Sequence, residues 1–256
     1  GNLSDARKKV EQALQLEPDF PEALNTLGNI LKDQKELDAA VDAYSRAMKS
    51  KGGFAEIFAN RGDAYRLAGE LRAAEADCQK AVRLKPCLST AHGNLAAVLM
   101  DLKDWTGAEL VLREAIRLDP EEVVFVINLS KTLVKLRRFE EALDAAVAAV
   151  NLRPKSADAL NALGNAHYER GDYAAAEKCY RKVLAAKPNH PDAHGNLGNT
   201  LARQNRFEEA EESINCSLSI NPKKIDALTN LGGVLQAQGR LDEALTKFEK
   251  ALKLDP

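Results

Sequence analysis

The sequence has little that would suit a disulfide-stabilised, membrane-spanning or nucleic-acid-binding protein. Its four cysteines, Cys78, Cys87, Cys179 and Cys216, form no CxxC pair, so neither a disulfide framework nor a zinc site is indicated. No apolar run is long enough for a transmembrane helix. The formal net charge is only −2, and no basic stretch marks a surface for nucleic acid or anionic lipid. We expect reduced thiols and a cytoplasmic or nuclear protein.

Signs of catalysis and of a cofactor are also missing. The chain contains no phosphate-binding loop, nucleotide fingerprint or nucleophile motif. His190 and His194 are four residues apart, but Pro191 lies between them, so they should not share a helical face that could bind a metal ion. We therefore expect no enzyme activity, no cofactor and no metal in this chain.

Proline recurs in this chain at a fixed spacing. Six prolines follow one another at intervals of 34 residues, Pro18 falls on the same grid, and Gly52 breaks it: the six are Pro86, Pro120, Pro154, Pro188, Pro222 and Pro256. A fixed period of about 20 to 50 residues is the signature of a repeat array. The grid predicts one array over residues 1–256, divided into 1–20, which is the second helix of a truncated repeat, and then 21–54, 55–88, 89–122, 123–156, 157–190, 191–224 and 225–256.

Each repeat has the pattern of two amphipathic helices of about 13 residues. The proline closes the second helix, because it cannot continue the backbone hydrogen bonding. A small residue near the start of the second helix allows close approach and recurs at Ala40, Ala74, Ala108, Ala142, Ala176, Ala210 and Ala244. The predicted turns between the two helices lie at Lys35, Gly69, Lys103, Arg137, Gly171, Asn205 and Gly239.

These features resemble the tetratricopeptide repeat family over essentially the whole chain. The resemblance implies an all-α solenoid of antiparallel helix pairs wound into a right-handed superhelix. It also implies that the first helices line a concave groove at the second, fifth, sixth, ninth, twelfth and thirteenth positions of each repeat. The chain begins inside a repeat and ends at a closing proline, so we expect it to be a fragment of a longer protein.

Asparagine recurs at three of the expected groove positions, the fifth, sixth and ninth, as Asn25, Asn29, Asn60, Asn94, Asn128, Asn161, Asn165, Asn196, Asn199 and Asn230. An amide side chain offers both donors and an acceptor. A ladder of such amides could bond the main chain of an extended peptide. The alternative is that each asparagine bonds the neighbouring helix or turn and stabilises the stack.

Other groove positions are apolar or basic. Met100, Val124 and Ile127 form a candidate anchor patch, and the alternative for this Val-rich segment is core packing. Lys131, Arg170 and Arg203 give the same stretch and the next a basic edge, which favours an acidic or polar peptide.

Two segments, 91–96 and 193–198, share the sequence Ala-His-Gly-Asn-Leu followed by Ala or Gly. They are similar to repeats of the O-linked N-acetylglucosamine transferase type, whose superhelix carries an asparagine ladder that selects protein substrates. The sequence thus predicts a protein-interaction scaffold that binds a protein or peptide in its groove. One alternative is the substrate-recognition arm of a larger enzyme, and another is a self-assembling scaffold that stacks through its repeat ends.

Arg61 departs from the repeat, because leucine stands at this position in Leu27, Leu95 and Leu129. A charged group at a packing position is costly unless it is paired. We expect Arg61 either to pair with Asp63 or Glu56, or to loosen the contact between repeats 21–54 and 55–88.

Overall fold

The structure is a computed structural model that describes residues 3–49 and 54–254. These residues form helices and turns, without a strand among them. The predicted all-α class is therefore confirmed. Gly52 and Pro256, on which part of the repeat pattern rested, lie outside the described residues.

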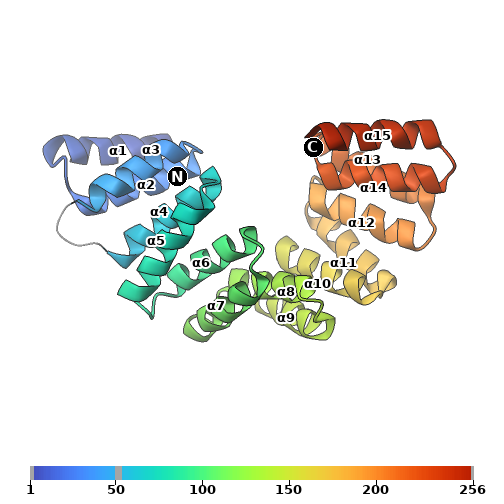
Figure 1. Cartoon of the computed structure of the whole chain (residues 1–256), viewed down its shortest axis with the longest axis horizontal. Coiled ribbons are helices and arrows are strands. Elements are labelled where there is room, and N and C mark those ends of the chain that lie inside the picture. Colours follow the sequence, from blue (N-terminus) through green and yellow to red (C-terminus); the bar gives the residue numbers. More distant parts are fainter. Residues whose placement is uncertain (1–2, 50–53, 255–256) are drawn as a thin grey trace. The chain divides into compact units, whose positions relative to one another are not determined.

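The chain divides into two compact units, Gly1–Thr132 and Leu133–Pro256, here called unit 1 and unit 2 (Figure 1). Unit 1 contains α1 (Leu3–Leu16), α2 (Pro21–Asp33), α3 (Leu37–Ala47), α4 (Ala55–Ala68), α5 (Leu71–Leu84), α6 (Ser89–Asp101), α7 (Trp105–Leu118) and most of α8 (Val123–Lys135). Unit 2 contains α9 (Phe139–Leu152), α10 (Ala157–Arg170), α11 (Tyr173–Ala186), α12 (Pro191–Arg203), α13 (Phe207–Ile220), α14 (Ile225–Ala237) and α15 (Leu241–Leu254).

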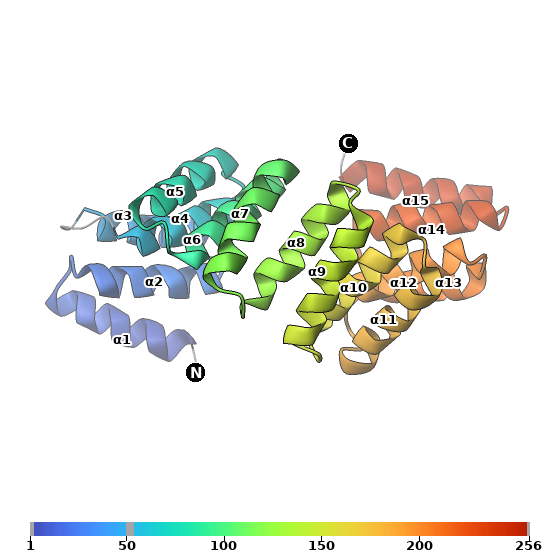
Figure 2. The same ribbon diagram turned by 90° about the horizontal axis from the view of Figure 1, so that it is seen from below.

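Helices pack in pairs within each unit. In unit 1, α2 packs on α3, α4 on α5 and α6 on α7, and in unit 2, α10 packs on α11, α12 on α13 and α14 on α15. The first helices of neighbouring repeats also touch: α4 contacts α2 and α6, and α12 contacts α10 and α14 (Figure 2). The predicted groove positions therefore lie on helices that are neighbours in space within each unit.

The turn between the two helices of a repeat has a left-handed residue at every predicted position. Backbone φ is between 60° and 87° at Lys35, Gly69, Lys103, Arg137, Gly171, Asn205 and Gly239. The Gly69 amide donates to the carbonyl oxygen of Arg66 at 3.1 Å, and the Glu70 amide donates to the carbonyl oxygen of Tyr65 at 2.9 Å. Such bonds satisfy carbonyls at a helix end, and the predicted turn residues are confirmed.

Prolines follow the ends of second helices within the described residues, as expected. The residue before the proline leaves the helix for an extended conformation, as at Lys85, where φ is −141° and ψ is 83°, and at Asp119, where they are −143° and 86°. The proline ring excludes the helical conformation from the residue that precedes it.

The two helices of a repeat approach through residues that have little or no side chain. A Cβ atom built on Gly28 would lie 2.5 Å from the ring of Tyr44, and one on Gly164 would lie 2.5 Å from the ring of Tyr180. The seven alanines predicted at the start of the second helices are buried, between 0% and 2% exposed. The predicted close approach is therefore confirmed, and glycine also has a role in it.

Arg61 is paired, but not with the residues that we expected. Its guanidinium binds both carboxylate oxygens of Asp77 on α5, at 2.7 and 3.0 Å, and donates to Ser45 Oγ on α3 at 2.9 Å. Asp63 and Glu56 are wrong as partners because they bind lysines, Lys32 and Lys85 respectively. Asp77 is only 7% exposed, so the ion pair joins α4 to α5 at a buried carboxylate, and the hydrogen bond to Ser45 joins Arg61 to α3.

We expect Gly69→Ala to lower the free energy of unfolding by about 1 kcal/mol, because an L side chain strains the left-handed conformation. Gly233→Ala is the matched control: it lies within helix α14, and a Cβ atom there meets nothing within 4 Å. Alanine there should raise stability by about 0.5–1 kcal/mol. Urea unfolding of the two variants measures both effects. Shifts in the same direction would contradict the role of backbone conformation at Gly69.

We expect Arg61→Leu to lower the free energy of unfolding by about 1–3 kcal/mol, because it leaves the buried carboxylate of Asp77 without its partner. The double variant Arg61→Leu, Asp77→Ala restores the residues found at these positions in repeat 21–54, Leu27 and Ala43. It should lie within about 1 kcal/mol of the native chain. Equal losses in the single and double variants, measured by urea unfolding, would contradict a coupled pair.

Candidate functional site

The predicted groove asparagines all lie on first helices and are half-buried. Unit 1 carries Asn25 and Asn29 on α2, Asn60 on α4, Asn94 on α6 and Asn128 on α8, and unit 2 carries Asn161 and Asn165 on α10, Asn196 and Asn199 on α12 and Asn230 on α14. Half-buried amides at the contact between neighbouring helices can bond either to those helices or to a ligand. The hydrogen bonds separate the two possibilities residue by residue.

In unit 1 two of the three sixth-position asparagines bond to the preceding repeat. Asn60 Nδ2 donates to Asn25 Oδ1 at 3.0 Å, and Asn94 Nδ2 donates to the carbonyl oxygen of Ala59 at 2.9 Å. Both acceptors belong to the fifth position of the previous first helix. These two amides therefore stabilise the stack, as in the second of the two interpretations of the asparagine pattern.

In unit 2 the same arrangement recurs with one more bond. Asn196 Nδ2 donates to Asn161 Oδ1 at 3.2 Å and to Asn165 Oδ1 at 2.9 Å. Asn196 thus connects α12 to α10 through both of its amide hydrogens. Its Oδ1 has no hydrogen-bond partner within the described residues, so one acceptor stays available on this face.

Two ninth-position asparagines bind a buried tyrosine of the second helix in their own repeat. The hydroxyls of Tyr44 and Tyr180 donate to Asn29 Oδ1 and Asn165 Oδ1, each at 2.7 Å. Burial raises the pKa of both phenols well above its usual value. Sequence reasoning missed this bond, although its signal was present: in both repeats a tyrosine follows the asparagine by fifteen residues.

Three of the predicted asparagines form no side-chain hydrogen bond within residues 3–49 and 54–254: Asn128 in unit 1 and Asn199 and Asn230 in unit 2. Space lies beside Asn230, on α14. Gly233, one turn further along the same helix, is exposed, and a Cβ atom there would meet nothing within 4 Å. Unit 2 thus combines unused amides with a backbone that a ligand can approach closely.

A cation and two aromatic rings flank this face of unit 2. Arg203 Nε donates to the Tyr173 hydroxyl at 3.1 Å, and its guanidinium lies 5.6 Å from the centre of the Tyr173 ring. Tyr168 packs edge-on against Tyr173, with the ring centres 5.5 Å apart. Arg203 forms no ion pair with a carboxylate in the part of the chain that the structure describes, whereas Arg170 lies 3.3 Å from Glu140 and 3.5 Å from Asp172.

The predicted apolar patch is only partly at the surface. Ile127 is 4% exposed, so its inclusion among ligand-binding residues was wrong, and the core-packing alternative describes it. Met100 is half-buried and packs against the core of α6 and α7. Val124 is half exposed and Lys131 is exposed. These residues therefore do not form a continuous apolar pocket.

The groove positions of unit 1 carry charges that neutralise one another. Lys32 Nζ binds Asp63 at 2.8 Å, Arg66 binds the other oxygen of Asp63 at 3.0 Å, and Arg66 also binds Asp101 at 3.1 Å. Burial opposes ionisation of Asp63, but Lys32 and Arg66 hold the pKa of its carboxyl below the usual value. This chain of ion pairs joins α2, α4 and α6 and leaves these residues little capacity for a charged ligand.

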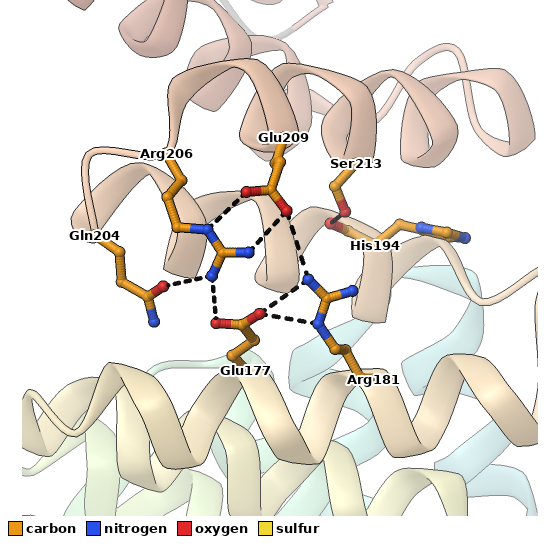
Figure 3. A network of polar contacts seen from close by, with 7 residues as sticks. All are labelled: Glu177, Arg181, His194, Gln204, Arg206, Glu209 and Ser213. Atoms are coloured by element: carbon orange, nitrogen blue, oxygen red, sulfur yellow. Dashed lines mark hydrogen bonds and ion pairs between the residues drawn. The ribbon is translucent and has the colours of Figure 1, made fainter.

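A second charge network links neighbouring repeats of unit 2 (Figure 3). Arg206, in the turn before α13, binds Glu209 at 2.7 Å and Glu177 of α11 at 2.8 Å, and Arg181 binds Glu177 at 2.9 Å. Partial burial opposes ionisation of Glu177, but the two arginines hold its pKa below the usual value. Arg240 repeats the pattern with Glu211 and Glu243. These arginines connect repeats and are already matched by carboxylates.

The described ranges contain neither a cluster of metal-ligating side chains nor a helix that could cross a bilayer. No group of three potential metal ligands occurs in them. His190 accepts from the Ala193 amide, and His194 bonds the Pro188 carbonyl at 2.8 Å. None of the described helices is long and apolar enough to span a bilayer. All four cysteines are free, and burial raises the pKa of Cys78 to about 12.

Comparison with known proteins identifies the kind of array. The family model described as the cilia and flagella-associated protein 70 C-terminal domain matches residues 1–221, and the model for the tetratricopeptide repeat matches residues 225–256. Protein O-mannosyl-transferase TMTC1 of Mus musculus is 32% identical over 95 residues, which are 36% of this chain and 10% of that protein. The chain therefore spans a small part of the length of this relative.

Two solved structures are similar in fold. The APC/C hetero-tetramer Cut9-Hcn1 matches 99% of this chain and 50% of that chain, with a TM-score of 0.82 and 16% identity. YrrB, described as a TPR protein with an unusual peptide-binding site, matches 73% of this chain and 97% of its own, with a TM-score of 0.54 and 26% identity. Both support an all-α solenoid.

Proposed function

Because the chain belongs to the family of the cilia and flagella-associated protein 70 C-terminal domain and consists of tetratricopeptide repeats, we propose that it binds an extended segment of a protein partner along α12 and α14 of unit 2. The observation that carries this proposal is the pair of asparagines, Asn199 and Asn230, whose amides have no partner within the described residues. A half-buried amide without a partner gains from a ligand that supplies one.

The main chain of an extended segment has the complementary groups. Each of its residues offers one N–H donor and one carbonyl acceptor. The free Oδ1 of Asn196 and both ends of the Asn199 and Asn230 amides can accept and donate in turn. Gly233 lets a ligand backbone come close, because no side chain occupies the space above it. Main-chain bonding of this kind places few demands on ligand sequence.

Arg203 adds a preference for an acidic residue in the ligand. It lies on α12, four residues after Asn199 and on the same helical face. Contact with Tyr173 fixes the guanidinium, and the absence of a nearby ion-pair partner within the described residues leaves its charge unmatched. A carboxylate of the ligand can form the charge-assisted bond that this group lacks.

The likeness to YrrB supports this function, since that protein is described as having a peptide-binding site and matches 73% of the chain. A cytoplasmic or nuclear location belongs to the same proposal, because all four cysteines are free thiols.

The test is selection from a random peptide library on the native chain, followed by affinity measurement on two double variants. Asn199→Ala with Asn230→Ala removes the two unused amides without breaking a bond within the fold. We expect this variant to bind the selected peptides about tenfold more weakly, from two lost hydrogen bonds. Arg203→Ala should reduce the preference for acidic residues in the selected sequences.

Asn151→Ala with Asn189→Ala is the matched control, because both asparagines are exposed and lie away from the first helices, in α9 and in the turn before α12. This control should bind like the native chain. Equal affinities of the two double variants for the selected peptides would refute the proposed site.

A second candidate function is the substrate-recognition arm of a larger enzyme. The observation that favours it is the similarity to protein O-mannosyl-transferase TMTC1 over 95 residues. The mass of the polypeptide isolated from its natural source, with peptide mapping beyond these repeats, decides whether a catalytic domain accompanies them.

A further inference from the structure

Unit 1 has a pocket that the asparagine pattern does not explain. It lies between the N-terminal ends of α2 and α4 and has a volume of about 180 Å³. Its walls are formed by Pro21, Glu22, Asn25, Phe54, Glu56 and Ile57. The first three belong to α2, and the others come from the start of α4 and the residue before it.

One part of the wall is apolar. Phe54 is the residue before α4, with an extended backbone at φ −67° and ψ 131°, and 45% of the residue is exposed. Ile57 is 3% exposed, so only its edge reaches the pocket. The proline ring of Pro21 completes this apolar surface, which suits a methylene chain or a ring.

The other part of the wall is acidic, and only one of its two carboxylates forms an ion pair within the described residues. Glu56 binds Lys85 Nζ at 2.6 Å, and this bond lowers the pKa of the Glu56 carboxyl below its usual value. Glu22 occupies the same repeat position on α2 and forms no side-chain hydrogen bond or ion pair within the described residues. Asn25 accepts a bond from Asn60 through Oδ1, so its Nδ2 remains available.

We propose that this pocket binds a lysine or arginine side chain of a protein partner. The methylene stem packs on Pro21 and Ile57, and the cation lies between the Phe54 ring and the Glu22 carboxylate. Long cationic side chains bury their stem on apolar surface while the charged end stays near water, and an aromatic face attracts the cation. Asn25 Nδ2 can donate to a main-chain carbonyl of the same segment.

Charge complementarity selects this occupant over the alternatives. An anionic side chain would be repelled by the Glu22 carboxylate, which has no ion-pair partner within the described residues, whereas Glu56 is paired with Lys85. A neutral apolar side chain would fill the pocket but would form no ion pair with the Glu22 carboxylate. The pocket is in unit 1, apart from the asparagines of α12 and α14, so it goes beyond the proposed function and can fail independently of it.

The test is a titration of the ¹⁵N-labelled full chain with three capped pentapeptides that differ only in the central residue: arginine, norleucine or glutamate. The arginine peptide should saturably shift the amide signals of Glu22, Asn25 and Phe54. It should bind roughly tenfold more tightly than the norleucine peptide, through its added ion pair and cation–π contact. The glutamate peptide should leave these signals unchanged.

Glu22→Gln should weaken the arginine peptide about fivefold and leave the norleucine peptide unaffected. Asp158→Asn is the control, because Asp158 is the equivalent exposed carboxylate in repeat 157–190 and lies outside this pocket. Equal binding of arginine and norleucine peptides, no saturable shift, or an unchanged affinity in Glu22→Gln would overturn the proposal. None of these results depends on Asn199 or Asn230, so the function proposed for unit 2 would still stand.

Discussion

The close approach of the two helices in a repeat is the constraint on which the candidate site depends. In repeat 157–190 the absent side chain of Gly164 lets the Tyr180 ring lie against α10. The ring then places its hydroxyl 2.7 Å from Asn165, and Asn165 accepts a further bond from Asn196 in the next repeat. A packing contact within one repeat thus fixes an amide on the face of the unit and, through that amide, the contact between repeats.

The two units use the same positions for different chemistry. On the first helices of unit 1, Lys32 and Arg66 form ion pairs with Asp63. These pairs stabilise the contact between repeats and compensate the charges on this face. On those of unit 2, the positions of Lys32, Asp63 and Arg66 carry uncharged residues, and Arg203 forms no ion pair with a carboxylate among the described residues. We therefore expect the proposed extended, acidic segment to bind unit 2. The proposed site beside Glu22, at the edge of unit 1, has the opposite charge preference.

Local backbone rules made much of the fold predictable. The left-handed turn at Lys103 and the break before Pro86 follow from the period and from the conformations that these residues allow. The partners of Arg61 and Tyr180 were not predictable in this way, because each lies on a different helix some fifteen residues away, and several carboxylates or amides compete for one donor. Ile127 was misplaced for a related reason. The fifth position lies where neighbouring first helices touch, and Ala59 and Ile127 are both buried there.

The inter-repeat bond of Asn196 also bears on the direction in which a ligand chain can run. Both amide hydrogens of Asn196 are committed to α10, whereas its Oδ1 is not. A ligand that presents an N–H at this point binds without cost to the stack, but one that presents a carbonyl must displace a bond between repeats. The two orientations of an extended chain offer these groups at different places along the helices. If unit 2 binds an extended segment as proposed, we therefore expect it to favour one chain direction, independently of the ligand side chains.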